Sequence, residues 1–381
     1  MSPNDLLLHF ESRYDDMLAE LGELVAIETP SHDAGAISRF VGRYRAALQG
    51  VGLACLEHPT PHGPCLSAEL PGEDPAVVLV GHSDTVWPLG AVADRPPTLR
   101  DGKLLGPGVY DMKGGLVLIL AALRFLAEHR VELRRRLVVF LACDEEKGGV
   151  SSHPLMDQLL ATDGTVLVPE PPCPDGSVKI ERKGVCIYTI RIGGREAHAG
   201  VEPQKGVSAI EEMSRLVLDL HAWNDPSRGI SLNVGRVDGG TASNVVAGQA
   251  SCDLDVRFAR PEDGEDLHRR VLALRPSHPE AAIDIDGGVL FPPLVPTAKS
   301  RELASMACDL ALELGVEIGF GSSGGGSDGS YLASRGLTVI DGLGIDGAGA
   351  HATSEHIVAD RIAFRAALMT GLVLALDERR G

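Results

Sequence analysis

The chain has few aromatic residues and little positive charge. Aromatic residues make up 4% of its 381 residues, and 35 Lys and Arg stand against 53 Asp and Glu, for a formal charge of −18 at pH 7. Nucleic acids and anionic membranes bind basic surfaces, so this balance argues against both as partners. The longest apolar stretch, residues 116–123, is too short to span a bilayer and is typical of a buried helix.

Closely spaced cysteine pairs are also missing. The seven Cys are scattered, without a C-x-x-C pattern, as expected for reduced thiols in the cytoplasm. The first twenty residues carry acids throughout and lack the basic flank and apolar core of a secretory signal. No H-E-x-x-H or Walker motif occurs. We therefore expect a soluble cytoplasmic protein.

Apolar strand-like runs alternate with amphipathic helical patterns over much of the chain. Continuous apolar strands between helices imply an α/β fold, with a largely parallel sheet covered by helices on both faces. The expected helices span residues 4–28, 34–49, 113–130 and 152–160, and the expected strands span 54–57, 65–70, 77–80, 137–142, 165–168 and 338–341.

A different order of elements begins after residue 182. It reads β-α-β-β-α-β, the ferredoxin-like split βαβ arrangement. Its strands are expected at 186–192, 230–237, 250–258 and 282–285, and its helices at 207–221 and 262–274. We therefore expect a catalytic domain of residues 1–182 and 292–381, interrupted by an inserted lid domain of residues 183–291.

The most informative segment is Gly-His-Ser-Asp-Thr-Val at residues 81–86. Apolar residues precede it, so it lies where a buried strand ends and a loop begins, the usual place for an active site in an α/β protein. His82 and Asp84 lie two apart on an extended strand and point the same way. One can hold a metal ion while the other hydrogen-bonds the far ring nitrogen of a histidine ligand.

Further acids and a histidine follow other predicted strands or precede a predicted helix. Because the carboxyl ends of parallel strands meet at one edge of a sheet, we expect these side chains to converge there. Separate segments thus contribute metal-binding side chains to this edge: Asp111, the pair Glu145 and Glu146, Glu170, and His351.

Together these residues predict a two-metal hydrolase. Such a site needs a bridging carboxylate, His and acidic ligands at each metal, and an open position for water. The two ligand sets would be His82, Asp111 and Glu170 for one metal, and Asp111, Glu146 and His351 for the other. Glu145 then remains unligated beside the water position, where a general base is needed.

Residues 82–86 (HSDTV), 108–115 (GVYDMKGG) and 144–146 (DEE) resemble the signatures of the di-zinc aminoacylase/carboxypeptidase superfamily. The resemblance covers nearly the whole chain and is closest to the glutamate carboxypeptidase branch. It implies that the five ligands named above bind two Zn²⁺ per subunit, although the ligand types also suit Co²⁺ or Mn²⁺. It also implies that Asp84 orients His82 and that Glu145 is the general base.

The resemblance extends to the lid domain. His198 is similar to a histidine that reaches the active site of the partner subunit and stabilises the oxyanion, which implies a homodimer formed through the lid. Asn244 and Arg257 resemble residues that bind the substrate carboxylate, and an Arg can do so with two parallel hydrogen bonds. Gly325 matches a loop whose backbone N–H groups approach that carboxylate. Lys183, at the domain boundary, could assist an anionic substrate.

The expected function is release of a C-terminal, glutamate-like amino acid from N-acyl or short peptide substrates. The main alternative is an N-acyl-amino-acid deacylase, similar to enzymes that act on acetylornithine or succinyl-diaminopimelate. A serine hydrolase is a remote alternative, because residues 321–325 fit G-x-S-x-G but lack an evident strand-to-helix elbow. A metal- or ligand-binding module without activity is another. The G-x-G-x-x-G match at residues 342–347 is weak because no regular helix follows it.

Overall fold

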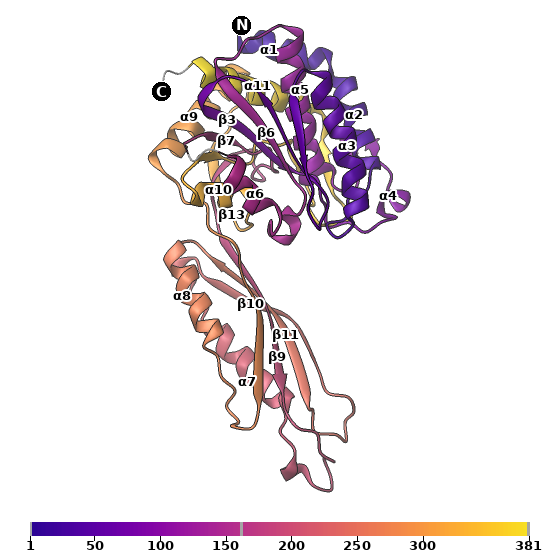
Figure 1. The fold of residues 1–381 in the computed structure, drawn as a ribbon, viewed down its shortest axis with the longest axis vertical. Helices are drawn as coiled ribbons and strands as arrows, with labels where there is room; N and C mark the ends of the chain where they lie inside the picture. The colour runs from indigo at the N-terminus through magenta and orange to yellow at the C-terminus, as the bar shows by residue number, and fades with distance from the viewer. Residues whose placement is uncertain (1, 161–162, 379–381) are drawn as a thin grey trace. The chain divides into compact units, whose positions relative to one another are not determined.

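The computed structural model describes residues 2–160 and 163–378, and the chain folds into two compact units (Figure 1). The smaller unit is Arg182–Val295 together with Gly324–Gly326, and the remainder of the chain forms the larger unit. The smaller unit therefore starts one residue before the predicted insertion, 183–291, and ends four residues after it. Backbone hydrogen bonds between Arg182 and Leu294, of 3.1 and 3.0 Å, explain the extension.

A six-stranded sheet forms the centre of the larger unit. Four neighbouring strands run parallel, and two antiparallel strands extend one side of the sheet. This confirms the expected α/β class with a largely parallel sheet. In spatial order the strands are β1 (Ala54–His58), β2 (Cys65–Leu70), β6 (Arg135–Ala142), β3 (Glu73–His82), β7 (Thr165–Leu167) and β14 (Thr338–Ile340).

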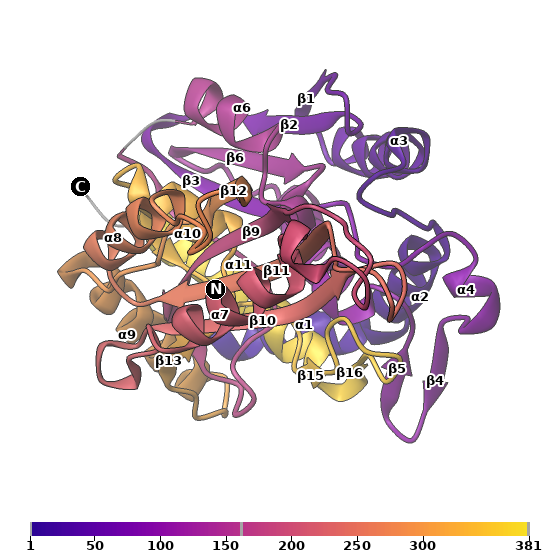
Figure 2. The same cartoon turned by 90° about the horizontal axis from the view of Figure 1, so that it is seen from below.

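Helices lie on both faces of this sheet (Figure 2). The two central strands show why: residues 76–82 of β3 and 137–142 of β6 are all buried, which requires cover on both sides. Helix α5 is buried nearly all round and packs against α11. The helices of this unit with eight or more residues are α1 (Pro3–Ser12), α2 (Tyr14–Ala26), α3 (Ala34–Gly50), α5 (Gly114–Glu128), α6 (Ser152–Leu159), α9 (Ala298–Glu313) and α11 (Ile362–Glu378).

The single helix predicted over residues 4–28 is wrong. The chain forms α1 and α2, which are separated at Arg13, where φ is −105° and ψ is 10°. Buried residues such as Phe10 and Met17 keep a helical spacing across the break. The apolar pattern therefore does not reveal the break, because buried residues recur at helical spacing both before and after Arg13.

Several short strands were not predicted. One four-stranded sheet has the order β15 (Gly347–Ala348), β16 (His356–Val358), β5 (Lys103–Leu105) and β4 (Thr98–Arg100). It pairs the segment after His351 with the segment before Asp111. A separate pair joins β8 (Val178–Arg182) and β13 (Phe320–Ser323). Strands of two to five residues carry too little periodicity to be recognised from sequence.

The smaller unit is an antiparallel sheet with two helices. Its elements are β9 (Gly184–Gly193), α7 (Ala209–His221), β10 (Ser231–Gly239), β11 (Gln249–Phe258), α8 (Pro261–Leu272) and β12 (Ala282–Phe291). The spatial order β10-β11-β9-β12 is the order of the ferredoxin-like fold that the sequence predicted. Alternate residues of β9 and β11 join residues of both helices in one apolar core. None of the helices in the described parts of the chain is both long and apolar enough to cross a membrane.

Candidate metal centre

Four adjacent parallel strands of the larger unit deliver side chains to one edge of the sheet. His82 is the last residue of β3, and Glu145 and Glu146 open the turn that follows β6. Glu170 lies three residues after β7, and His351 lies in the loop after β14. Because these four strands are neighbours and run the same way, their carboxyl ends meet there.

Asp111 reaches this edge from the tight turn Val109–Lys113, which leads into α5. Gly108 precedes the turn at φ +72°, a conformation that favours glycine, and a Cβ there would lie 2.7 Å from Thr85 Cγ2. At Gly115, a Cβ would lie 2.0 Å from the carbonyl oxygen of Pro169. Glycine at both positions therefore lets the turn and the start of α5 approach the neighbouring segments closely.

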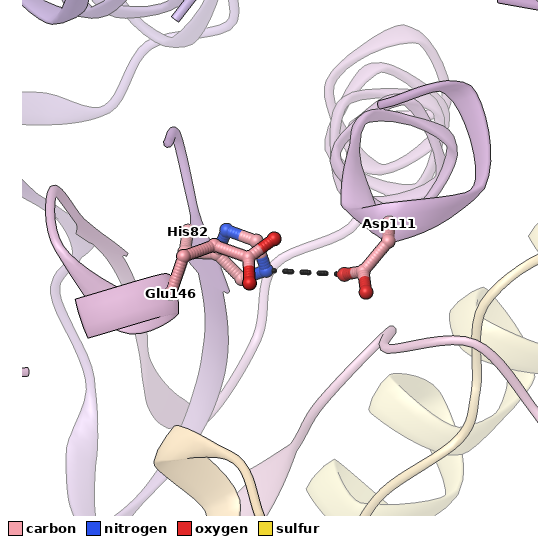
Figure 3. Close-up of side chains that lie close together, drawn as sticks. All are labelled: His82, Asp111 and Glu146. Atoms are coloured by element: carbon pink, nitrogen blue, oxygen red, sulfur yellow. Dashed lines mark ion pairs between the residues drawn. The ribbon is translucent and has the colours of Figure 1, made fainter. Parts of the chain in front are cut away.

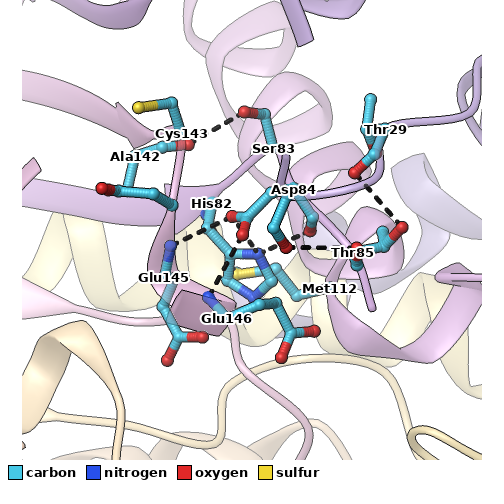
Figure 4. Close-up of polar contacts among 12 residues, drawn as sticks. Thr29, His82, Ser83, Asp84, Thr85, Met112, Ala142, Cys143, Glu145 and Glu146 are labelled. Atoms are coloured by element: carbon cyan, nitrogen blue, oxygen red, sulfur yellow. Dashed lines mark hydrogen bonds and ion pairs between the residues drawn. The ribbon is translucent and has the colours of Figure 1, made fainter. Parts of the chain in front are cut away.

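The His82 ring is fixed from one side and faces acids on the other. Its Nδ1 lies 2.9 Å from the backbone oxygen of Asp84, which can only accept, so Nδ1 donates (Figure 4). The neutral ring therefore keeps its lone pair on Nε2. This nitrogen lies 3.3 Å from Asp111 Oδ1 and 3.2 Å from Glu170 Oε1. The arrangement is that of a histidine oriented to bind a metal ion.

These groups converge without forming well-aligned hydrogen bonds. Among the described residues, neither His82 Nε2 nor Glu146 Oε1 has a hydrogen-bond partner, although both atoms are buried. Buried polar atoms are rarely left in this state. Ligand atoms of His82, Asp111 and Glu146 all lie within 4.8 Å of one another (Figure 3). The chemistry and spacing of these donors fit a divalent cation.

Asp111 lies between two histidines. Its Oδ1 faces His82, whereas its Oδ2 lies 3.4 Å from His351 Nε2. The same His351 nitrogen is 3.2 Å from Glu146 Oε2. The two oxygens of one carboxylate thus face two separate groups of donors, the geometry that a carboxylate needs to bridge two cations.

Asp84 supports the site through both its backbone and its side chain. Its carboxylate, 3.4 Å from His82 Nδ1, accepts hydrogen bonds from the backbone N–H groups of Glu145, at 3.1 Å, and Glu146, at 3.2 Å. The ring of His82 is hydrogen-bonded instead by the backbone carbonyl of Asp84. Asp84 therefore connects the end of β3 to the turn that carries the two acids, a role that the sequence did not suggest.

Burial and mutual repulsion perturb the acids of the cluster. Burial raises the pKa of Glu145 well above its usual value, and it raises the pKa of Glu146 to about 7. Burial would also raise the pKa of Asp111, but the neighbouring imidazoles of His351 and His82 outweigh it and lower that pKa. The neighbouring carboxylates of Asp111 and Glu146 raise the pKa of His351 to about 10. The cluster of acids therefore favours positive charge nearby, which bound metal ions would supply.

Two further carboxylates stabilise segments around the site and were not predicted from the sequence. Glu355 accepts hydrogen bonds from the turn that carries Asp111 and from Trp87. Asp346 pairs with Arg365, whose side chain is fully buried in α11, at 2.8 and 2.9 Å. Glu355 follows His351 by four residues, and this close spacing to a predicted ligand is the only sequence signal that could have indicated it.

His198 and Asn244 lie on neighbouring segments of the smaller unit. Their segments are joined by the bond from Ala199 N to Asn244 O, of 2.9 Å, and both side chains are exposed. His198 Nδ1 accepts from the backbone N–H groups of Gly200 and Val201, each at 3.1 Å. In the neutral ring the proton is therefore on Nε2, which is free to donate.

Arg257 and Gly325 lie close together in the same unit. Arg257 makes two hydrogen bonds to Asp255, of 2.7 and 2.6 Å, and a third, of 3.2 Å, to the carbonyl of Gly324. The pair with Asp255 lies within β11 and is not the cross-strand bridge that β-strand pairing would suggest. Gly325 accepts through its carbonyl from buried Arg182 at 3.2 Å, while Lys183 is partly exposed.

Comparison with known proteins identifies the family. The sequence profile of Peptidase family M20/M25/M40 matches residues 78–375, most of the chain, so the protein belongs to this family of peptidases and amidohydrolases. Carboxypeptidase G2 from Pseudomonas sp. is 29% identical over 350 residues, which cover 90% of this chain and 84% of that protein. A succinyl-diaminopimelate desuccinylase from Gluconacetobacter diazotrophicus is 30% identical over 374 residues, which cover 91% and 92%.

Solved structures support the same fold. A tripeptidase from Staphylococcus aureus aligns with a TM-score of 0.77 at 20% identity, covering 96% of this chain and 99% of that one. An M20 metallo-carboxypeptidase from Sulfolobus solfataricus aligns with a TM-score of 0.74 at 16% identity, covering 95% and 99%. The fold is therefore that of the family, and the candidate metal site lies in its larger unit.

Proposed function

We propose that the protein is a two-zinc amide hydrolase that releases a glutamate-like C-terminal amino acid from N-acyl or short peptide substrates. The observation that carries the proposal is the position of Asp111, whose two oxygens face His82 and His351 separately. One ion would be held by His82, Asp111 and Glu170, and the other by Asp111, Glu146 and His351. Co²⁺ or Mn²⁺ would suit the same ligands.

Glu145 is the general base in this mechanism. Bound cations would lower the pKa of a water molecule and polarise the scissile carbonyl. Glu145 is buried, and its backbone is held by Asp84, so its carboxylate is fixed at the edge of the sheet where the predicted metal ligands converge and a general base is needed. It takes the proton of the attacking water and then delivers a proton to the leaving amine.

The smaller unit would supply groups that bind the substrate. His198 presents an Nε2–H that can donate to a developing oxyanion. Asp255 accepts from Nε and Nη2 of Arg257, and the carbonyl of Gly324 accepts from Nη1, so a substrate carboxylate would use the second N–H of Nη1 and of Nη2. The N–H groups around Gly325 would bind the same carboxylate, and Lys183 would add positive charge. Asn244 lies with His198 at the other end of β11 from Arg257, so Asn244 would reach that carboxylate only from the partner subunit, as proposed for His198.

We also propose that the protein forms a homodimer through the smaller unit, because the proposed role of His198 requires a partner subunit.

We propose a cytoplasmic location as well. It is supported by the seven cysteines, which are all free thiols in the structure.

Removal of a succinyl or acetyl group from an N-acyl amino acid is the second candidate function. It is supported by the desuccinylase relative, which is as similar to this chain as carboxypeptidase G2. Both reactions cleave an amide beside a carboxylate and would use the same catalytic residues. The two differ in which side of the amide the protein recognises.

A panel of N-acyl amino acids assayed on zinc-loaded protein tests these proposals. The leaving groups should include glutamate, aspartate, ornithine and an aromatic amino acid, each with benzoyl, acetyl and succinyl acyl groups. A kcat/KM that follows the leaving amino acid supports the carboxypeptidase, whereas one that follows the succinyl group supports the desuccinylase. No hydrolysis of any amide by protein that binds two zinc ions would contradict both.

A further inference from the structure

Glu355 is buried and fully engaged in hydrogen bonding. The residue is only 2% exposed, and its carboxylate accepts four hydrogen bonds. Oε2 accepts from the indole N–H of Trp87 at 2.7 Å and from Gly108 N at 2.9 Å. Oε1 accepts from Tyr110 N at 3.0 Å and from Asp111 N at 3.1 Å. Each oxygen of the carboxylate therefore has two N–H donors.

These four bonds connect three segments of the metal centre. Trp87 follows the His82–Asp84 segment, and residues 108–111 lead to the predicted bridging carboxylate. Glu355 itself lies four residues after His351, in the loop that ends at β16. The pairing of β16 with β5 supports the same contact, because β5 leads directly into residues 106–108.

The geometry points to Glu355 as a positioning residue for metal binding. We propose that it fixes the backbone of residues 108–111, so that the two oxygens of Asp111 are already directed to His82 and His351 before any ion binds. This inference rests on the proposed metal centre. Groups that orient metal ligands typically change metal affinity or activity 10- to 100-fold when they are replaced.

The chemistry requires a carboxylate at this position. A glutamine could accept from Tyr110 and Asp111 through its one oxygen, but its NH₂ group would then face two further N–H donors, those of Gly108 and Trp87. Glu355→Gln therefore conserves shape and removes only part of the network. Trp87→Phe removes one donor of the four and leaves the three backbone contacts in place, so it should cause the same change to a smaller extent.

Zinc titration of metal-free protein tests the inference independently of catalysis. Competition with a chromophoric chelator gives the affinity of each site in the wild type, Glu355→Gln and Trp87→Phe. We expect Glu355→Gln to weaken the more weakly bound zinc about 10- to 100-fold, and Trp87→Phe to weaken it less. At saturating zinc, kcat should fall in Glu355→Gln while KM stays within about threefold.

Glu20→Gln is the matched control. Glu20 is also a buried acid of the larger unit, and its carboxylate pairs with Arg124 in α5 at 2.5 and 2.6 Å and lies 3.7 Å from Arg43. Neither of these partners is a predicted metal ligand. This variant should lose thermal stability and bind both zinc ions with unchanged affinity. Weaker zinc binding in Glu20→Gln, equal to that in Glu355→Gln, would mean that general destabilisation explains the effect.

The remaining outcomes are also decisive. Wild-type zinc affinity and kcat in Glu355→Gln would overturn the inference while leaving the proposed function intact. Wild-type protein that binds two zinc ions but hydrolyses no amide would overturn the proposed function, and the titration would still test Glu355. If Glu355→Gln does not fold, Trp87→Phe decides: unchanged zinc affinity in that variant overturns the inference.

Discussion

Glu145 is joined to Asp84 through its backbone, because its N–H donates to Asp84 Oδ1 at 3.1 Å. The bond uses only the backbone of Glu145, so its side chain does not take part. The turn that carries Glu145 is thereby held against the end of β3. Glu146 is held in the same way by the other oxygen of Asp84. The carboxylate of Asp84 therefore holds the backbone of both the proposed base and the neighbouring proposed metal ligand.

Replacing Glu145 by Gln should abolish most turnover and leave metal binding intact. The amide cannot accept a proton, and loss of a general base typically lowers the rate about 100- to 10,000-fold. The measurements are kcat on the preferred amide and zinc content by elemental analysis. We expect about two zinc ions per subunit in this variant, and full activity would remove Glu145 from the mechanism.

Asp84→Asn should lower activity, because it weakens the hydrogen bonds that hold the backbone of Glu145 and Glu146. The amide nitrogen of Asn would face the N–H of Glu145 or Glu146, and a buried donor without a partner costs about 1–3 kcal/mol. We expect kcat to fall about 10- to 100-fold. Ser83→Ala is the control, because Ser83 loses only its bond to the Ala142 carbonyl. Equal kcat values in the two variants would contradict the role of Asp84.

Asp346→Asn should destabilise the larger unit strongly. The neutral side chain would leave Arg365, which is fully buried, as an uncompensated charge, at a cost of about 3–5 kcal/mol. Glu57→Gln is the control, because its pair with Arg45 is partly exposed and should contribute about 0–1 kcal/mol. Urea unfolding followed by circular dichroism measures both. Similar midpoints for the two variants would refute the importance of the buried pair.

The destabilisation caused by Asp346→Asn should shrink in acid. Burial alone would raise the pKa of Asp346, but its hydrogen bond and ion pair with Arg365 outweigh burial and lower that pKa. The contribution is therefore complete above the unfolded value of about 4 and is lost as the pH falls through the lower, folded value. We expect the stability difference between wild type and variant to be constant from pH 5 to 7 and to narrow below pH 4. A difference that widens in acid would contradict this sign.

Removal of metal should inactivate and destabilise the protein. Without cations, the acids of the centre repel one another, and this repulsion opposes folding, although the imidazoles of His82 and His351 offset part of it. These acids are Asp111, Glu145, Glu146 and Glu170. A ligand present at 100 times its Kd stabilises the folded state by about 2.7 kcal/mol. Thermal unfolding with a chelator, and again after zinc is restored, measures this effect. An unchanged Tm together with chelator-resistant activity would exclude a metal centre.

The α/β class, the ferredoxin-like insertion and the positions of the predicted ligands at strand ends could be predicted from sequence. Buried parallel strands are continuous apolar runs, and polar residues directly after such runs must lie at the carboxyl edge of the sheet. His82, Glu146 and Glu170 could be placed for this reason. The break between α1 and α2 could not, because an apolar periodicity continues through it.

The sequence alone predicted which donors would meet, since the donor types and their positions directly after apolar strands are local properties of the chain. Only the tertiary structure decided how those donors are held. The four bonds of Glu355, the backbone bonds of Asp84 and the pairing of Arg365 with Asp346 join residues up to 268 positions apart. Contacts at such separations depend on how the loops pack together in three dimensions, and no periodicity in the sequence encodes them.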